Sequence, residues 1–411
     1  MMSRRAFLTA GGLTVVAAGV GGVPSFLTRA AASTPQGVFR RRKVLVTVFQ
    51  RGAMDGLAAV QPIADPMLQR LRPTLSLGAS DLVDLDGRNG LHPALSPLAP
   101  YFREGRLGIV HGAGSPVATR SHFDAQDFME TGRPGDKSAE TGWLNRATGL
   151  LGHEPETPFQ AVALTPQLPL SLRGPAPTLA IARLDDFGIT GTGSLAAGET
   201  LEALYAQTTA DLLSTSGSEG LDAARLLEEA RLGQYTPANG AEYPRSELGE
   251  SLRQIAQLIK ADVGLEVAFA EAGGWDTHAR QGAARGSFAR RAEDLAQSLA
   301  AFWTDIAAHH DDVTVLTMTE FGRTVAENGT GGTDHGRASA MFVLGNDVRG
   351  GEVHGAPLVL DPDALEDGRD LPVTTDFRSL FAGVAGGHLG IATGEALFPG
   401  WSGTPLDIVR G

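Results

Sequence analysis

The sequence predicts an α/β fold in which a doubly wound, mainly parallel sheet carries helices on both faces. Apolar, strand-like segments alternate along the chain with segments of helical periodicity, and this alternation is typical of βαβ units. Four of the strand-like segments run directly into glycine turns that also contain acidic, hydroxyl or imidazole side chains. Because ligands bind at the carboxyl ends of the strands in an open α/β sheet, we expect these side chains to meet at one edge.

The first 32 residues predict a twin-arginine export signal. Arg4 and Arg5 precede a mild apolar stretch rich in glycine and alanine, and three alanines at 30–32 match a cleavage site. We therefore expect a mature chain that begins at Ser33, is periplasmic or secreted, and has the twin-arginine translocase as its export partner. An uncleaved membrane anchor is the alternative, but the apolar stretch is short and glycine-diluted for a stable span.

The composition narrows the classes of function. The formal net charge of −13 argues against a nucleic-acid-binding surface, which would need a basic face. The chain has no cysteine, which excludes disulfides, thiolate metal ligands and a cysteine nucleophile. It also contains no G-x-S-x-G elbow, dinucleotide fingerprint or Walker loop, so a serine esterase of the usual α/β-hydrolase type is disfavoured.

The first part of the mature chain predicts two strands and two helices. Lys43–Phe49 alternates and then runs apolar, which indicates a first strand, and Leu107–Val110 indicates a second. Between them, His92–Phe102 predicts a short helix that covers the sheet. Phe123–Glu130 predicts a helix that begins just after Ser121.

The composition changes between residues 151 and 245. Proline is dense through Pro155–Pro177, and alanine, leucine and glutamate dominate from Glu199 to Leu232. Two amphipathic helices are predicted there, at Thr200–Leu213 and Leu221–Leu232. Since this block carries no cluster of histidines or paired ligand motif, we expect a cap or insertion that shapes access of the substrate. The α/β domain then spans residues 33–411 around it.

Helix and strand alternate again after residue 245. Ser246–Asp262 and Gln281–His310 carry apolar residues at helical spacing, and the apolar run Leu265–Ala270 between them predicts a strand. The remaining predicted elements are the strands Val313–Met318 and Ala338–Leu344 and the helix Asp376–Leu389, which Asp376 caps.

Aspartate and histidine side chains follow two of these strands. Asp276 and His278 follow one strand, and Asp334 with His335 lies in the glycine-rich loop after another. Carboxylates and neutral imidazoles are ligands for divalent metal ions, here zinc, manganese or calcium. Two such sets allow two ions a few ångströms apart, which together activate an attacking oxygen and stabilise a leaving one. For the Asp334–His335 pair alone, a helix cap beside a surface histidine is the alternative.

Three further residues have two possible roles each. Asp55 follows the first strand in a glycine turn, where it is either a metal ligand or an ordinary turn aspartate. Glu320 either binds metal or transfers a proton, or it caps the next element or pairs with Arg323. Ser121 is a helix N-cap that, near a metal and Arg120, is also a candidate nucleophile toward a phosphate or sulfate ester.

Four long motifs carry a resemblance to a known family. They are RSHFDAQDFMETG (Arg120–Gly132), GGWDTH (Gly273–His278), TEFGRT (Thr319–Thr324) and GTDHG (Gly332–Gly336). On these motifs the chain resembles the domain of unknown function 1501 family of twin-arginine-exported bacterial proteins. Relatives of that family belong to the alkaline phosphatase and sulfatase superfamily, so the resemblance implies an alkaline phosphatase-like sheet with metals at its carboxyl edge.

The resemblance also implies roles for individual residues. One ion would be bound by Asp55, Asp334 and His335 and a second by Asp276 and His278, with Ser121 as the nucleophile. Two features depart from the usual pattern. Ala53 and Met54 stand beside Asp55 where the family usually has Gly-Asn, and the Asp-x-His spacing of Asp276 and His278 is tighter than in typical phosphatases. The third ligand of the second ion is open, with His354 as a candidate.

Together these features predict an exported metal-dependent hydrolase of phosphate or sulfate esters, acting on a small molecule or a polymer. The predicted catalytic residues are Ser121, Arg120 and Glu320. The alternative is a non-catalytic exported binding protein that retains the fold and a structural metal. No stable membrane anchor is expected in either case.

Overall fold

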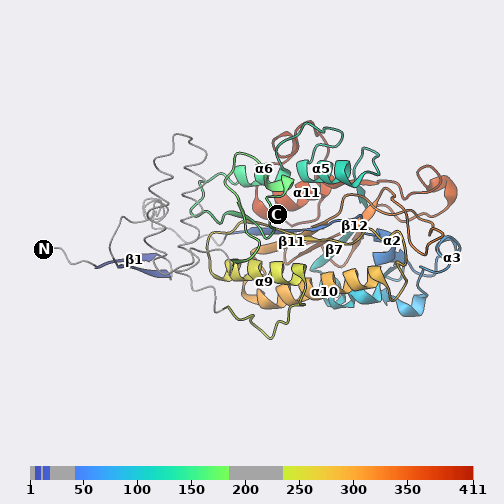
Figure 1. Ribbon diagram of the computed structural model, residues 1–411, viewed down its shortest axis with the longest axis horizontal. Coiled ribbons are helices and arrows are strands. Elements are labelled where there is room, and N and C mark those ends of the chain that lie inside the picture. Colours follow the sequence, from blue (N-terminus) through green and yellow to red (C-terminus); the bar gives the residue numbers. More distant parts are fainter. Residues whose placement is uncertain (1–4, 11–12, 19–41, 185–234, 411) are drawn as a thin grey trace.

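The structure is a computed structural model that describes residues 5–10, 13–18, 42–184 and 235–410. The predicted helices Thr200–Leu213 and Leu221–Leu232, and the predicted cleavage site before Ser33, lie outside the described residues. In the described part, a nine-stranded sheet forms the centre of the molecule, with helices α5, α6 and α11 on one face and α9 and α10 on the other (Figure 1). This arrangement confirms the predicted α/β fold with helices on both faces.

The sheet is mainly parallel, as predicted. Its order is β13-β7-β12-β11-β3-β10-β8-β9, and β14 also pairs with β7. Only β12 runs against its neighbours among the described strands of this sheet. The strands are β3 (Val44–Gln50), β7 (Leu107–Gly114), β8 (Ala161–Ala163), β9 (Leu179–Ala180), β10 (Val267–Ala272), β11 (Val313–Met318), β12 (Ser339–Gly345), β13 (Val353–His354) and β14 (Thr375–Asp376).

The reversed direction of β12 matters for the site. The chain leaves β11 at the carboxyl edge of the sheet, crosses that edge in the loop 319–338, and returns down β12. Both ends of the loop therefore lie at the edge where β3, β7 and β10 also end. The predicted strand ends near Phe49, Val110, Ala270 and Met318 accordingly belong to one sheet with a common carboxyl edge.

The central strands read as continuous apolar runs because both of their sides are covered. In β3, Val46 and Val48 pack into the core beneath α9 and α10, whereas Leu45 and Phe49 pack into the core beneath α6 and α11. Successive side chains of a strand point to opposite faces, so one strand supplies both cores. The helices are α2 (Gly56–Ala59), α3 (Pro66–Leu71), α4 (Ala99–Arg103), α5 (His122–Thr131), α6 (Trp143–Gly149), α9 (Glu247–Lys260), α10 (Ser287–Asp305) and α11 (Phe377–Leu389).

Two predicted helices have different bounds in the structure. The segment predicted as a helix at His92–Phe102 forms a 3-10 helix (Pro93–Leu98) followed by α4, because proline inside the segment cannot donate the hydrogen bond of a regular α-helix. The helix predicted from Gln281 begins only at Ser287, since Gly282 and Gly286 take positive φ angles of 73° and 147°. The N-cap role of Asp376 is confirmed, because its side chain accepts the N–H of Arg378.

The described residues at either end of the predicted cap region belong to the main body. β8 and β9 extend one edge of the large sheet, so at least this part of residues 151–245 is continuous with it. The cap itself stays a prediction. Two small sheets complete the described chain, one of β1 (Arg5–Ala10) and β2 (Leu13–Ala18) and one of β4 (Val60–Pro62), β5 (Val83–Asp84) and β6 (Asn89–Leu91). No helix in the described ranges is both long and apolar enough to cross a bilayer.

Candidate metal centre

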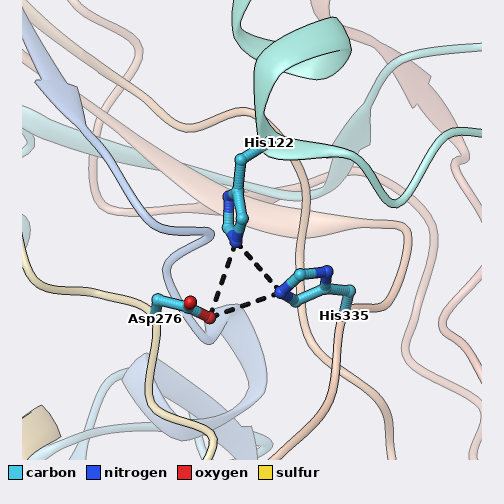
Figure 2. A group of neighbouring side chains, drawn as sticks. All are labelled: His122, Asp276 and His335. Atoms are coloured by element: carbon cyan, nitrogen blue, oxygen red, sulfur yellow. Dashed lines mark hydrogen bonds and ion pairs between the residues drawn. The ribbon is translucent and has the colours of Figure 1, made fainter.

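Three side chains from separate segments meet at the carboxyl edge of the sheet. His122 is the first residue of α5, Asp276 follows β10, and His335 lies in the loop between β11 and β12 (Figure 2). The Nε2 atoms of His122 and His335 are 3.0 Å apart. Asp276 Oδ1 lies 3.5 Å from Nε2 of His122 and 3.3 Å from Nε2 of His335. We call these three residues the three-donor cluster.

His278 adds a fourth possible donor. Its Nε2 atom lies 2.8 Å from Nε2 of His335 and 3.1 Å from Oδ1 of Asp276. The ion–donor distances of zinc sites, about 2.0–2.2 Å, place neighbouring donors of a tetrahedral site roughly 3.3 Å apart. The observed separations of 2.8–3.5 Å are of that size.

The other ring nitrogen of each histidine contacts an acceptor. Nδ1 of His122 lies 2.8 Å from a carboxylate oxygen of Glu320, and Nδ1 of His335 lies 2.8 Å from the carbonyl oxygen of Arg120. Nδ1 of His278 lies 3.1 Å from Oδ1 of Asp334. Ionised carboxylates and carbonyls only accept hydrogen bonds, so each Nδ1 carries a proton and each neutral ring keeps a lone pair on Nε2.

Three imidazole lone pairs and a carboxylate oxygen therefore face one another. Such an arrangement is repulsive unless a proton or a metal ion lies between the donors. An outer acceptor that fixes the tautomer and orientation of the ring is also the usual surrounding of a metal-bound histidine. The donor set and its supports thus fit a divalent metal ion.

Glu320 acts on the cluster through His122. Its buried carboxylate also accepts hydrogen bonds from the backbone N–H of Gly52 and from Nε2 of Gln126. Burial alone raises the pKa of Glu320, but the hydrogen bonds from His122 and Gln126 outweigh it and hold that pKa below its ordinary value. In turn, the hydrogen bond and charge of Glu320 raise the pKa of His122.

Burial has the opposite effect on the neighbouring imidazole. It lowers the pKa of His335 below the ordinary value, since the charged form loses its contact with water. His335 is therefore held as the neutral ring that a metal ligand requires.

Arg323 ties the segments of the site together. Its buried guanidinium donates to the carbonyl oxygens of Gly52, Ala53 and Thr333 and to the carboxylate of Asp276. Burial raises the pKa of Asp276, but the hydrogen bond and charge of Arg323 lower it below its ordinary value overall. The aspartate is consequently held ionised beside the imidazoles.

Asp55 lies in a different environment from the one expected of a metal ligand. It forms a buried ion pair with Arg72, whose Nη1 atom is 2.8 Å from Oδ2. Its two oxygens also accept from the backbone N–H of Ala58 and from Nε2 of Gln281. The acceptor positions of this carboxylate are occupied, and the structure does not bring it into the three-donor cluster.

The remaining candidate residues surround the cluster in other ways. Ser121 is the N-cap of α5, since its hydroxyl accepts the N–H of Asp124 over 3.4 Å. Arg120 forms an ion pair with the buried Asp370 while its carbonyl oxygen contacts His335. His354 lies in β13, where its Nε2 atom contacts the carbonyl oxygen of Arg349.

The residue of the three-donor cluster that was not among the predicted ligands is His122. It belongs to the motif Arg120–Gly132 and follows the N-cap Ser121 directly, so its position at the first turn of a helix at the strand edge was the available signal. The two-ion arrangement implied by the resemblance stays a prediction. The described residues bring together one cluster, in which His122 stands and Asp55 does not.

Comparisons with known proteins were made for both sequence and fold. No curated protein matches the chain in sequence. Among solved structures, the C-terminal periplasmic domain of EcEptC from Escherichia coli, in complex with Zn, is 9% identical, with a TM-score of 0.37 and coverage of 75% of this chain and 73% of that chain. A sulfatase from Pseudoalteromonas sp. is 13% identical, with a TM-score of 0.33 and coverage of 80% and 66%.

An alkaline phosphatase from the Antarctic bacterium TAB5 is 10% identical, with a TM-score of 0.27 and coverage of 75% of this chain and 93% of that chain. Residues 109–397 match the family described as "Protein of unknown function (DUF1501)". Because that match covers more than half of the chain and includes every residue of the three-donor cluster, the protein belongs to the DUF1501 family.

Proposed function

We propose that the protein is an exported metal-dependent hydrolase of phosphate or sulfate esters. One observation carries the proposal: the Nε2 lone pairs of His122 and His335 and the carboxylate of Asp276 converge within 3.5 Å of one another at the edge of the sheet. His122, His335 and Asp276 would hold a divalent ion there, and it would supply Lewis-acid polarisation of an ester oxygen.

The donor chemistry favours a particular class of ion. Imidazole nitrogen suits zinc and other transition metals, whereas calcium takes six to eight oxygen ligands. Of the three expected ions, zinc fits a cluster rich in histidine best, whereas manganese and calcium prefer oxygen ligands.

The surroundings of the cluster favour an anionic ester. α5 begins at His122, so the positive end of its dipole lies beside the donors. The carbonyl oxygen of Arg120 contacts Nδ1 of His335, and the guanidinium of Arg369 donates to the carbonyl oxygen of His335. Both guanidinium groups also pair with the buried carboxylate of Asp370. The partly exposed guanidinium of Arg369 is thus beside the backbone of a cluster residue, where it could also bind a phosphate or sulfate group.

Ser121 is the nucleophile in this proposal. It adjoins the ligand His122, and its only capping bond is the long one to the N–H of Asp124. Its oxygen would displace the alcohol of the ester, and water would then release the phosphate or sulfate.

A specific observation supports the second candidate, a non-catalytic metal-binding protein. With His278 included, four protein donors lie within reach of one ion. Structural zinc sites are filled by four protein ligands, whereas catalytic sites keep one position open.

The experiment that separates the two is metal analysis of the purified protein followed by a panel of phosphatase and sulfatase substrates. If the protein is a hydrolase, the wild type turns over an ester, and His122→Ala and His335→Ala lose both the bound metal and this turnover. His354→Ala, outside the cluster, keeps both. Tightly bound metal without turnover on any ester would favour the binding protein, and absence of bound metal would contradict both.

A further inference from the structure

We infer that His278 is an exchangeable ligand, which closes the metal site at rest and leaves the ion when an anionic substrate arrives. His122, His335 and Asp276 are the permanent ligands in this arrangement. The inference rests on the proposed function, because it requires an ion at the three-donor cluster.

His278 has the reach of a ligand. Its Nε2 atom is 2.8 Å from Nε2 of His335 and 3.1 Å from Oδ1 of Asp276, distances similar to those within the three-donor cluster. Its Nδ1 proton is directed to the carboxylate of Asp334, which leaves the Nε2 lone pair for the ion.

The three histidines differ in how firmly they are held. The side chain of His278 is 43% exposed, against 23% for His122 and 22% for His335. Water therefore reaches His278 and competes for its contacts more readily than it does at the other two.

The acceptors behind the rings differ in the same direction. Glu320, behind His122, is 0% exposed, and Gly52 and Gln126 both donate to its carboxylate. Asp334, behind His278, is 56% exposed and accepts from the side chain of Asn328. A buried, multiply bonded acceptor is costly to disturb, whereas an exposed one exchanges its partners with solvent.

The backbone at His278 is nevertheless fixed. Its carbonyl oxygen accepts from Nδ2 of Asn328 at 2.9 Å and from Oγ1 of Thr330 at 2.6 Å. Gly332 packs so closely that a Cβ atom there would overlap the carbonyl group of His278. The ring can thus leave the ion by rotation of its own side chain, on a fast time scale and without movement of the loop.

This exchange accounts for both features of the site. At rest, four protein donors would fill all four positions of a tetrahedral ion. When His278 is displaced, three protein donors remain and the fourth position is open for the substrate. A phosphate or sulfate oxygen would take the place of Nε2 of His278, next to Nε2 of His335 and the carboxylate of Asp276.

The test is a Co²⁺ titration of the full-length purified protein and four variants, followed by visible absorption. His278→Ala should keep its Co²⁺ affinity within about tenfold of wild type while its absorption spectrum changes. His122→Ala and His335→Ala should lose more than the roughly 10- to 100-fold that loss of an orienting partner costs. His354→Ala, a histidine in β13 outside the cluster, should match wild type in both measurements.

Inorganic phosphate supplies a second measurement. It should perturb the Co²⁺ spectrum of His278→Ala at a lower concentration than that of wild type, because the position is already open. Asp334→Asn, which keeps the ring but weakens its support, should fall between the two. If His278→Ala does not fold, the Co²⁺ affinity and spectrum of His278→Gln and Asp334→Asn are compared with those of wild type instead.

Three results would overturn the inference. A loss of affinity in His278→Ala as large as in His122→Ala would make His278 a permanent ligand. An unchanged spectrum would show that His278 does not bind the ion. Wild-type protein that binds no Co²⁺ would instead refute the proposed metal site, and the inference with it.

Discussion

The buried carboxylate of Glu320 accepts a hydrogen bond from His122, with 2.8 Å between Nδ1 of His122 and Oε1 of Glu320. This contact turns Nε2 of His122 toward Asp276 and His335. A carboxylate that supports a histidine ligand raises the basicity of the ring and fixes its orientation. Glu320 is thus a positioning residue, and its replacement provides the first prediction.

Glu320→Gln should lower the affinity for Zn²⁺ by roughly 10- to 100-fold, because the amide keeps the shape of the side chain but not its charge. Isothermal titration calorimetry measures the effect. Glu271→Gln is the matched control, since Glu271 lies at the end of β10, pairs with Arg51 and makes no contact with a residue of the three-donor cluster among its described bonds. Equal affinities in the two variants would contradict the positioning role.

Arg323→Lys should lower the free energy of unfolding by several kcal/mol. A lysine cannot reach the carbonyl groups of Gly52, Ala53 and Thr333 together, and each buried carbonyl left without a donor costs about 1–3 kcal/mol. Urea denaturation monitored by tryptophan fluorescence measures the loss. Arg349→Lys, at an exposed pair with Asp407, should change stability by less than about 1 kcal/mol. Similar stability losses in both would be inconsistent with the bridging role of Arg323.

Ser121→Ala should abolish most ester turnover while metal content is retained. The variant also loses the N-cap of α5, which costs about 1 kcal/mol of stability whether or not the serine is catalytic. The measurement is therefore activity per folded, metal-loaded molecule. Wild-type activity on that basis would show that Ser121 is only a cap and that water is the nucleophile.

The protein should lose stability in mild acid because of the buried His388. Burial lowers the pKa of its imidazole from 6.5 to about 4. An unfolded chain takes up this proton near pH 6.5 but the folded protein does not until about pH 4, so the stabilisation is complete above pH 6.5 and is lost as the pH falls between these values. The slope for one such group is about 1.4 kcal/mol per pH unit.

Urea denaturation at pH 7 and at pH 5 measures this effect. His388→Gln should lose less stability than wild type between the two pH values, although it is less stable at pH 7 because the contacts with Thr314 and Val44 change. His354→Gln, at a partly exposed site in β13, should follow wild type. Parallel losses in wild type and His388→Gln would refute the assignment.

Export is predicted to require both arginines of the signal. Replacement of Arg4 and Arg5 by lysine should leave the precursor in the cytoplasm, because a twin-arginine translocase recognises a signal by its pair of arginines. Cell fractionation and immunoblotting measure the distribution. Normal export of the double variant would rule out the twin-arginine route.

The fold was largely predictable because its signals are local. The apolar run Val313–Met318 predicts a strand, and β11 has these same bounds, since a strand covered on both faces needs apolar residues throughout. The N-caps Ser121 and Asp376 were predictable for a similar reason, because a capping side chain acts on residues two or three positions away. The start of α10 was not, because the positive φ of Gly286 depends on how the loop packs.

The sequence by itself determined which kinds of candidate ligand collect, and at which edge of the sheet. Asp276, His278 and His335 follow strands of one sheet, and the carboxyl ends of those strands converge. The tertiary structure alone decided which side chains meet. Asp55 lies at the same edge, but its carboxylate forms an ion pair with Arg72. The ring of His122 is oriented toward the cluster by its hydrogen bond to Glu320, a residue far away in the sequence. Periodicity locates a residue to within one edge of a sheet, but a metal site depends on distances of a few ångströms, which only long-range packing sets.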